Sequence, residues 1–121
     1  MDVAATCSLR VTIGLCWEQY TAFLRPGGAQ RILRDVSKTV RRLAGPPAVL
    51  CYAVANEIPS SIVRWYCKTR IERFIGRLCA AVKSEDPAAL VTYVNFPPPN
   101  ILSCRFSILQ RSMFIWRRRL V

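Results

Sequence analysis

Polar residues follow three apolar runs of this 121-residue chain, at the points where strands would end. Trp17 and Glu18 follow the run 9–15, Asn56 and Glu57 follow the run 48–54, and Asn95 follows the run 90–94. In parallel α/β proteins, functional groups collect at the carboxyl ends of the strands. The pattern therefore predicts a polar site on a hydrophobic scaffold.

Glu57 is the residue best suited to chemistry. A carboxylate at a strand end can be held among apolar groups, which favour the protonated form that a general acid needs. The alternative is that Glu57 caps the following helix or pairs with an arginine. A lone Asn-Glu dipeptide is a weak motif, and without further context it favours this structural role.

The order of apolar patterns predicts two consecutive βαβ units. Short runs at 9–15, 48–54 and 90–94 read as strands, and the run at 48–54 is apolar throughout, as in a strand buried on both faces. Helical stripes fill 31–43, which Gly45-Pro46-Pro47 ends, and about 60–84, with Ser60 and Ser61 as caps. The chain is thus expected to be α/β with a parallel sheet.

The charge is strongly basic but unevenly placed. The formal net charge is +11, yet every acidic residue lies at or before Asp86, and the segment from Pro97 onward has five arginines and no acid. We therefore expect no nucleic-acid partner. The alternative function is a non-catalytic module that binds polyanions or a membrane surface through Arg117–Arg119, near Phe114 and Trp116.

The six cysteines form no CxxC pair and the chain has no histidine, so neither a metal site nor a cofactor is expected. We interpret them as free, mostly buried thiols. No run approaches a membrane span, and nothing near Met1 resembles a signal peptide, which predicts a cytoplasmic protein. A dinucleotide-binding half-domain is the weakest alternative, because no G-x-G-x-x-G follows a strand.

Several strings between residues 3 and 97 resemble, in order and with few gaps, a group of bacterial proteins related to glycoside hydrolase family 2. The matching strings are Gly14-Leu-Cys-Trp-Glu-Gln19, Ala53-Val-Ala-Asn-Glu-Ile-Pro59, Ile62-Val-Arg-Trp65, Ile71-Glu-Arg-Phe74 and Leu90-Val-Thr-Tyr-Val-Asn95. The chain departs from that group at Pro46, at Ala55 and at Tyr66-Cys67, where the group tends to have His, Gly and His-Gly.

The resemblance implies a partial (β/α)8 TIM barrel that holds about the third to fifth strands with their helices. It implies that Glu57 is the acid/base carboxylate of a retaining glycosidase and that Asn56 binds a sugar hydroxyl. Trp17 and Trp65 would stack on sugar faces, and Asn95 would join the substrate site; core or loop packing is the alternative for both tryptophans.

The same resemblance sets the expected limits of this chain. A complete barrel needs about 250 residues, and the group's second glutamate, the nucleophile, has no counterpart here. Residues 1–97 would be an inactive partial barrel whose missing parts lie on another chain. Residues 98–121 would be an aberrant basic tail translated out of frame, because one shifted frame with plausible codons restores family-like strings after Pro97.

Overall fold

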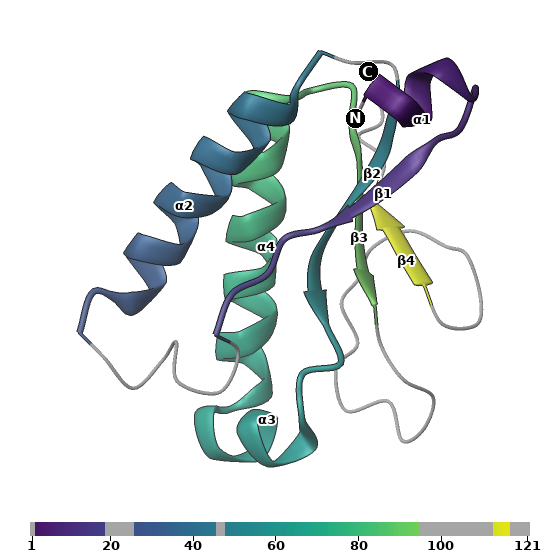
Figure 1. The fold of residues 1–121 in the computed structure, drawn as a ribbon. Coiled ribbons are helices and arrows are strands. Elements are labelled where there is room, and N and C mark those ends of the chain that lie inside the picture. Colours follow the sequence, from purple (N-terminus) through teal and green to yellow (C-terminus); the bar gives the residue numbers. More distant parts are fainter. Residues whose placement is uncertain (1, 19–25, 46–47, 95–112, 117–121) are drawn as a thin grey trace, which may run out of the picture.

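The computed structural model describes residues 2–18, 26–45, 48–94 and 113–116 (Figure 1). Its elements along the chain are α1 (Asp2–Thr6), β1 (Val11–Gly14), α2 (Gly28–Leu43), β2 (Val49–Asn56), α3 (Ser60–Tyr66), α4 (Lys68–Glu85), β3 (Leu90–Val94) and β4 (Met113–Trp116).

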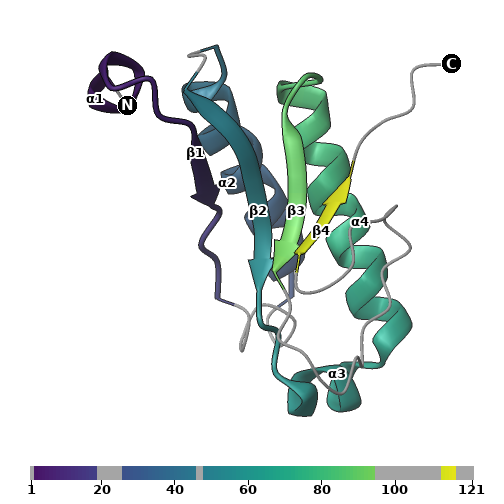
Figure 2. The ribbon, with the colours of Figure 1, turned by 90° about the vertical axis from the view of Figure 1, so that its right-hand side faces the viewer.

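The strands form a four-stranded sheet in the order β1-β2-β3-β4. The first three run parallel, and β4 runs antiparallel to β3, as the reversed arrow in Figure 2 shows. Tyr52 of β2 is in register with Ile13 of β1 and with Val91 of β3. The centre of the sheet is therefore the continuous apolar run, as the sequence predicts.

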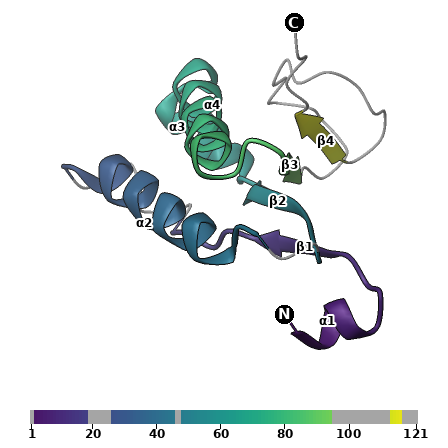
Figure 3. The same cartoon turned by 90° about the horizontal axis from the view of Figure 1, so that it is seen from above.

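Both long helices cover the same face of the sheet (Figure 3). Val40 from α2, Ile75 and Leu78 from α4, and Tyr52 and Val91 from the sheet are all fully buried in one cluster. Burying side chains of this kind contributes about 1.5–3 kcal/mol each to stability. The apolar stripes at 3.6-residue spacing are thus the surfaces that join helices to sheet.

The prediction of a partial TIM barrel is wrong. In a barrel the strand after β3 would continue the parallel series and the sheet would close on itself. Instead β4 lies antiparallel beside β3, and the four described strands form an open sheet. What the structure shows is an α/β arrangement with three parallel strands, and its fourth strand comes from the segment expected to be an aberrant tail.

The helix predicted over about 60–84 is two helices. Cys67 separates α3 from α4 because its backbone has φ 71° and ψ 130°, a conformation outside the helical region. The predicted caps are also wrong: Pro59 occupies the N-cap position of α3, no side chain caps it, and Ser60 begins the helix. Among the described helices, none is long and apolar enough to cross a membrane.

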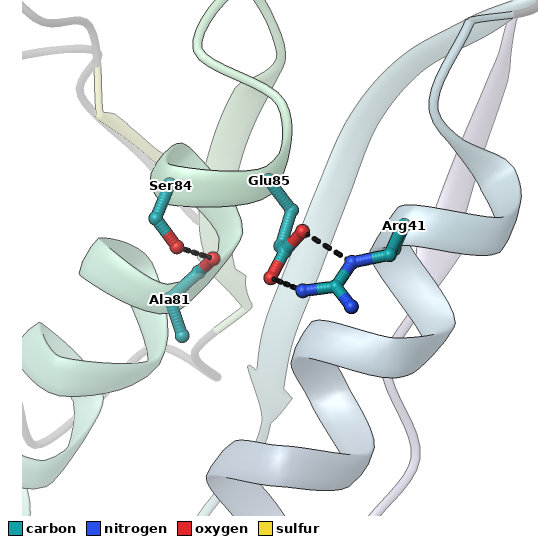
Figure 4. A network of polar contacts seen from close by, with 4 residues as sticks. All are labelled: Arg41, Ala81, Ser84 and Glu85. Atoms are coloured by element: carbon teal, nitrogen blue, oxygen red, sulfur yellow. Dashed lines mark hydrogen bonds and ion pairs between the residues drawn. The ribbon is translucent and has the colours of Figure 1, made fainter.

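An ion pair links the last turns of α2 and α4 (Figure 4). Arg41 donates from Nε and Nη2 to the two carboxylate oxygens of Glu85, at 2.9 and 2.8 Å. These hydrogen bonds lower the pKa of the Glu85 carboxyl. A bidentate guanidinium–carboxylate contact fixes geometry as well as charge, so it holds the two helices side by side at this end.

Five of the six cysteines lie in the described residues, and all five are free, which confirms that part of the prediction. Their expected burial is wrong for most of them, since Cys7, Cys16 and Cys67 are exposed while Cys51 and Cys79 are buried. Burial raises the pKa of the Cys51 thiol. Thiolate is the reactive form, so the fold should divide these cysteines into two kinetic classes.

We predict that iodoacetamide alkylates Cys7, Cys16 and Cys67 in the folded chain, while Cys51 and Cys79 react at least about ten-fold more slowly because they need local opening. Peptide mass spectrometry after timed labelling gives the rate at each site. In concentrated urea, which serves as the denatured control, the exposed and buried cysteines should react at similar rates. Equal rates for Cys16 and Cys51 in the folded chain would contradict this packing.

Candidate functional site

The carboxyl ends of β1, β2 and β3 meet at one edge of the sheet, shown at the bottom of Figure 2. The amide of Leu15, just beyond β1, donates to the carbonyl oxygen of Ala53 at 2.9 Å. The amide of Glu57 donates to the carbonyl oxygen of Val94 at 2.9 Å, which joins the end of β2 to the end of β3. The predicted strand-end residues of β1 and β2 are therefore brought to a common edge, as expected.

Glu57 lies at this edge with an exposed side chain. It is exposed, its backbone has a φ of 46°, and its carboxylate makes no hydrogen bond or ion pair with any part of the chain that the structure describes. It neither caps α3 nor pairs with an arginine there, so the structural role weighed in the sequence is not observed. The apolar surroundings expected for a proton donor are not observed either.

Asn56, the neighbour of Glu57, ends β2 and is also exposed. It is in register with Val94, the last described residue of β3. Asn95, the third strand-end residue of the prediction, lies outside the described residues. The structure thus places Asn56 at the end of β2 and Glu57 directly after it, at the point where the ladder with β3 ends.

Trp17 has a packing role. Its indole Nε1 donates to the carbonyl oxygen of Val54 at 2.7 Å, and its ring meets that of Phe74 edge to face, with centroids 5.5 Å apart. These contacts fasten the segment after β1 onto β2 and α4. The sugar-stacking role of Trp17 stays a prediction.

Trp65 has a different environment. It lies on α3 with 80% of its surface exposed, more than any other large apolar side chain of the described residues. An exposed indole costs hydration free energy and suits a flat ligand. Of the two tryptophans, Trp65 is the one whose ring is open to solvent.

A cleft of about 430 Å³ lies between the segment after β1 and one flank of α2. Leu15, Ile32 and Val36 supply apolar lining. Glu18, Arg31, Asp35 and Trp17 also line it, whereas Asn56 and Glu57 do not. The α2 side of this cleft was not predicted from the sequence, although the i, i+4 spacing of Arg31 and Asp35 places both on one flank of the helix.

Within residues 2–18, 26–45, 48–94 and 113–116, no group of histidine, cysteine, aspartate or glutamate side chains is arranged to hold a metal ion. Comparisons with protein-family models, with curated proteins and with solved structures find no significant match to this chain. The assignment to a glycosidase family therefore stays a prediction from the sequence strings.

We predict that Trp17→Phe lowers the free energy of unfolding by about 1–2 kcal/mol, because it keeps an aromatic ring near Phe74 but leaves the Val54 carbonyl without its donor. Trp65→Phe is the matched control and should change stability by less than about 0.5 kcal/mol. Urea denaturation followed by far-UV circular dichroism measures both. A Trp17→Phe chain as stable as the parent would contradict the fastening role.

Proposed function

We propose that Asn56 and Glu57 form the proton-donating side of a retaining glycosidase site. The observation that carries this proposal is the exposed Glu57 carboxylate, which has no partner among the described residues, at the carboxyl edge of the parallel strands directly after Asn56. Its support from the sequence is the string Ala53-Val-Ala-Asn-Glu-Ile-Pro59, which resembles the acid/base segment of enzymes related to glycoside hydrolase family 2.

In this proposal Glu57 gives its proton to the glycosidic oxygen as the bond to the anomeric carbon breaks. The Asn56 amide donates a hydrogen bond to a sugar hydroxyl and orients the ring. The hydrogen bond from the Glu57 amide to the Val94 carbonyl oxygen fixes the backbone position from which the Glu57 side chain extends. Each role uses a group that the described residues leave accessible.

The retaining route needs a second carboxylate about 5–5.5 Å from the first, which attacks the anomeric carbon. Glu18 is the other carboxylate that follows a strand of the parallel set, and no string around it resembles a nucleophile segment. We therefore propose that this chain supplies the acid/base group alone. By itself it should not hydrolyse glycosides.

An external nucleophile can test the proton donor separately. Azide attacks the anomeric carbon, the bond to the aryl oxygen breaks, and the Glu57 proton passes to that oxygen, so the products are a glycosyl azide and a phenol. We predict azide-dependent release from a panel of phenyl glycosides, and a fall of about 10²-fold or more in Glu57→Gln because general-acid catalysis is lost. Dinitrophenyl glycosides, whose leaving group needs no proton, should depend little on Glu57.

Glu18→Gln is the matched control, since it neutralises the other strand-end carboxylate. Azide-dependent release that is unchanged in Glu57→Gln but lost in Glu18→Gln would contradict the assignment of the proton donor. Hydrolysis without azide that disappears in Glu57→Gln would contradict the claim that the chain lacks a nucleophile.

A further inference from the structure

The outer surfaces of α2 and α4 carry two stripes of exposed cations. On each helix the cations recur at spacings of three and four residues, on the side opposite the buried apolar stripe. We call these seven residues the basic face: Arg31, Arg34, Lys38 and Arg42 on α2, and Arg70, Arg73 and Arg77 on α4.

The two stripes form one surface because the helices lie side by side on the same side of the sheet (Figures 1 and 3). The Arg41–Glu85 ion pair that links the helices has no net charge, so this surface stays positively charged. Glu72 pairs with Lys68 on the flank of α4. Among the described residues, Asp35 is then the one exposed acid on α2 that faces this excess of positive charge.

Repulsion between the cations of the basic face destabilises the two helices when only water and salt surround it. Lys38 lies four residues from both Arg34 and Arg42, and Arg73 lies four residues from Arg77. Like charges at this spacing destabilise a helix, whereas solvated helix faces usually alternate the two signs. A bound polyanion would convert this repulsion into attraction.

We propose that the basic face binds the phosphate backbone of nucleic acid without reading its sequence, an activity independent of the proposed glycosidase site. The α2 stripe from Arg31 to Arg42 spans about 16 Å at 1.5 Å per residue. Duplex DNA presents about nine phosphate charges over that length. Six of the seven cations are arginines, whose planar forks suit phosphate oxygens.

The shape of the face explains why contacts would stop at the backbone. Two helices packed side by side offer a broad surface with no projecting recognition helix, so the cations reach phosphates and not base edges. Contacts of this kind fix position but carry no sequence information.

A membrane surface fits this face less well than nucleic acid. Helices that lie in a lipid interface bury an apolar stripe beside their cations. The exposed large apolar side chains of the described residues are Val3, Leu9, Leu50 and Trp65, and none of them lies on α2 or α4.

This proposal revises the expectation that the chain has no nucleic-acid partner. That expectation came from the uneven spread of charge along the sequence, where the arginine-rich segment after Pro97 supplies much of the excess. Folding sorts them: Glu85 is neutralised by Arg41 and Glu72 by Lys68, while the cations at three- and four-residue spacing are left together on one face.

The test measures binding of the full chain to mixed-sequence 20-nucleotide duplex and single-stranded DNA by fluorescence anisotropy over a range of salt (20 base pairs are roughly four times the length that the α2 stripe spans). We expect both DNAs to bind, with log K falling against log salt at a slope of about −3 to −6. In R34Q/R73Q/R77Q the affinity should drop by about ten-fold or more, and the slope should shrink by about two to three. R34K/R73K/R77K keeps the charges and should stay within about three-fold of the parent.

The variant R117Q/R118Q/R119Q removes the same number of arginines from the tail and should change affinity by less than about three-fold, because the proposal assigns the phosphate contacts to the basic face. An equal or larger loss in the tail variant would overturn the proposal in favour of the Arg-rich tail. Affinities that differ more than about ten-fold between DNA sequences would overturn it. Preferential binding to phosphatidylserine vesicles, or no DNA binding at low salt, would overturn it as well.

Discussion

The parallel ladders on either side of β2 hold the rest of this structure in place. Residues 51–55 are buried on both faces of the sheet, so their peptide groups need partners from β1 and β3. Because those two strands must run parallel to β2, each returning connection carries a helix, and the carboxyl ends of all three strands reach one edge. This parallel arrangement is what places Asn56 and Glu57 near the end of β3 and the segment after β1.

Burial of β2 also has a cost that the fold tolerates. The Tyr52 hydroxyl is buried and has no hydrogen-bond partner in the described part of the chain, and desolvation raises the pKa of its phenol. The Tyr52 side chain is fully buried in one cluster with core residues of α2 and α4. The free energy gained by burying the aromatic ring therefore outweighs the cost of one missing hydrogen bond at the centre of the sheet. This is expected for a large aromatic side chain, whose burial contributes more than a single hydrogen bond does.

The three parallel strands and the helix α2 could be predicted because continuous apolar runs and 3.6-residue stripes are properties of the sequence itself. Three features could not. The break at Cys67 depends on one backbone conformation inside an uninterrupted helical pattern. The antiparallel strand Met113–Trp116 lies in a segment whose charge suggested an aberrant tail. The exposure of Glu57 depends on how the edge folds, whereas its position after an apolar strand suggested apolar surroundings.

We propose that the edge carrying Asn56 and Glu57 is a carbohydrate site, separate from the basic face. A titration of the ¹⁵N-labelled chain with neutral oligosaccharides, followed by ¹H–¹⁵N correlation spectra, tests it most directly. We expect shifts of the Asn56 side-chain amide and the Glu57 backbone amide, and none at Lys38 or Arg73. Spectra that do not change at Asn56 and Glu57 with any sugar of the panel, or that change only on α2 and α4, would contradict it.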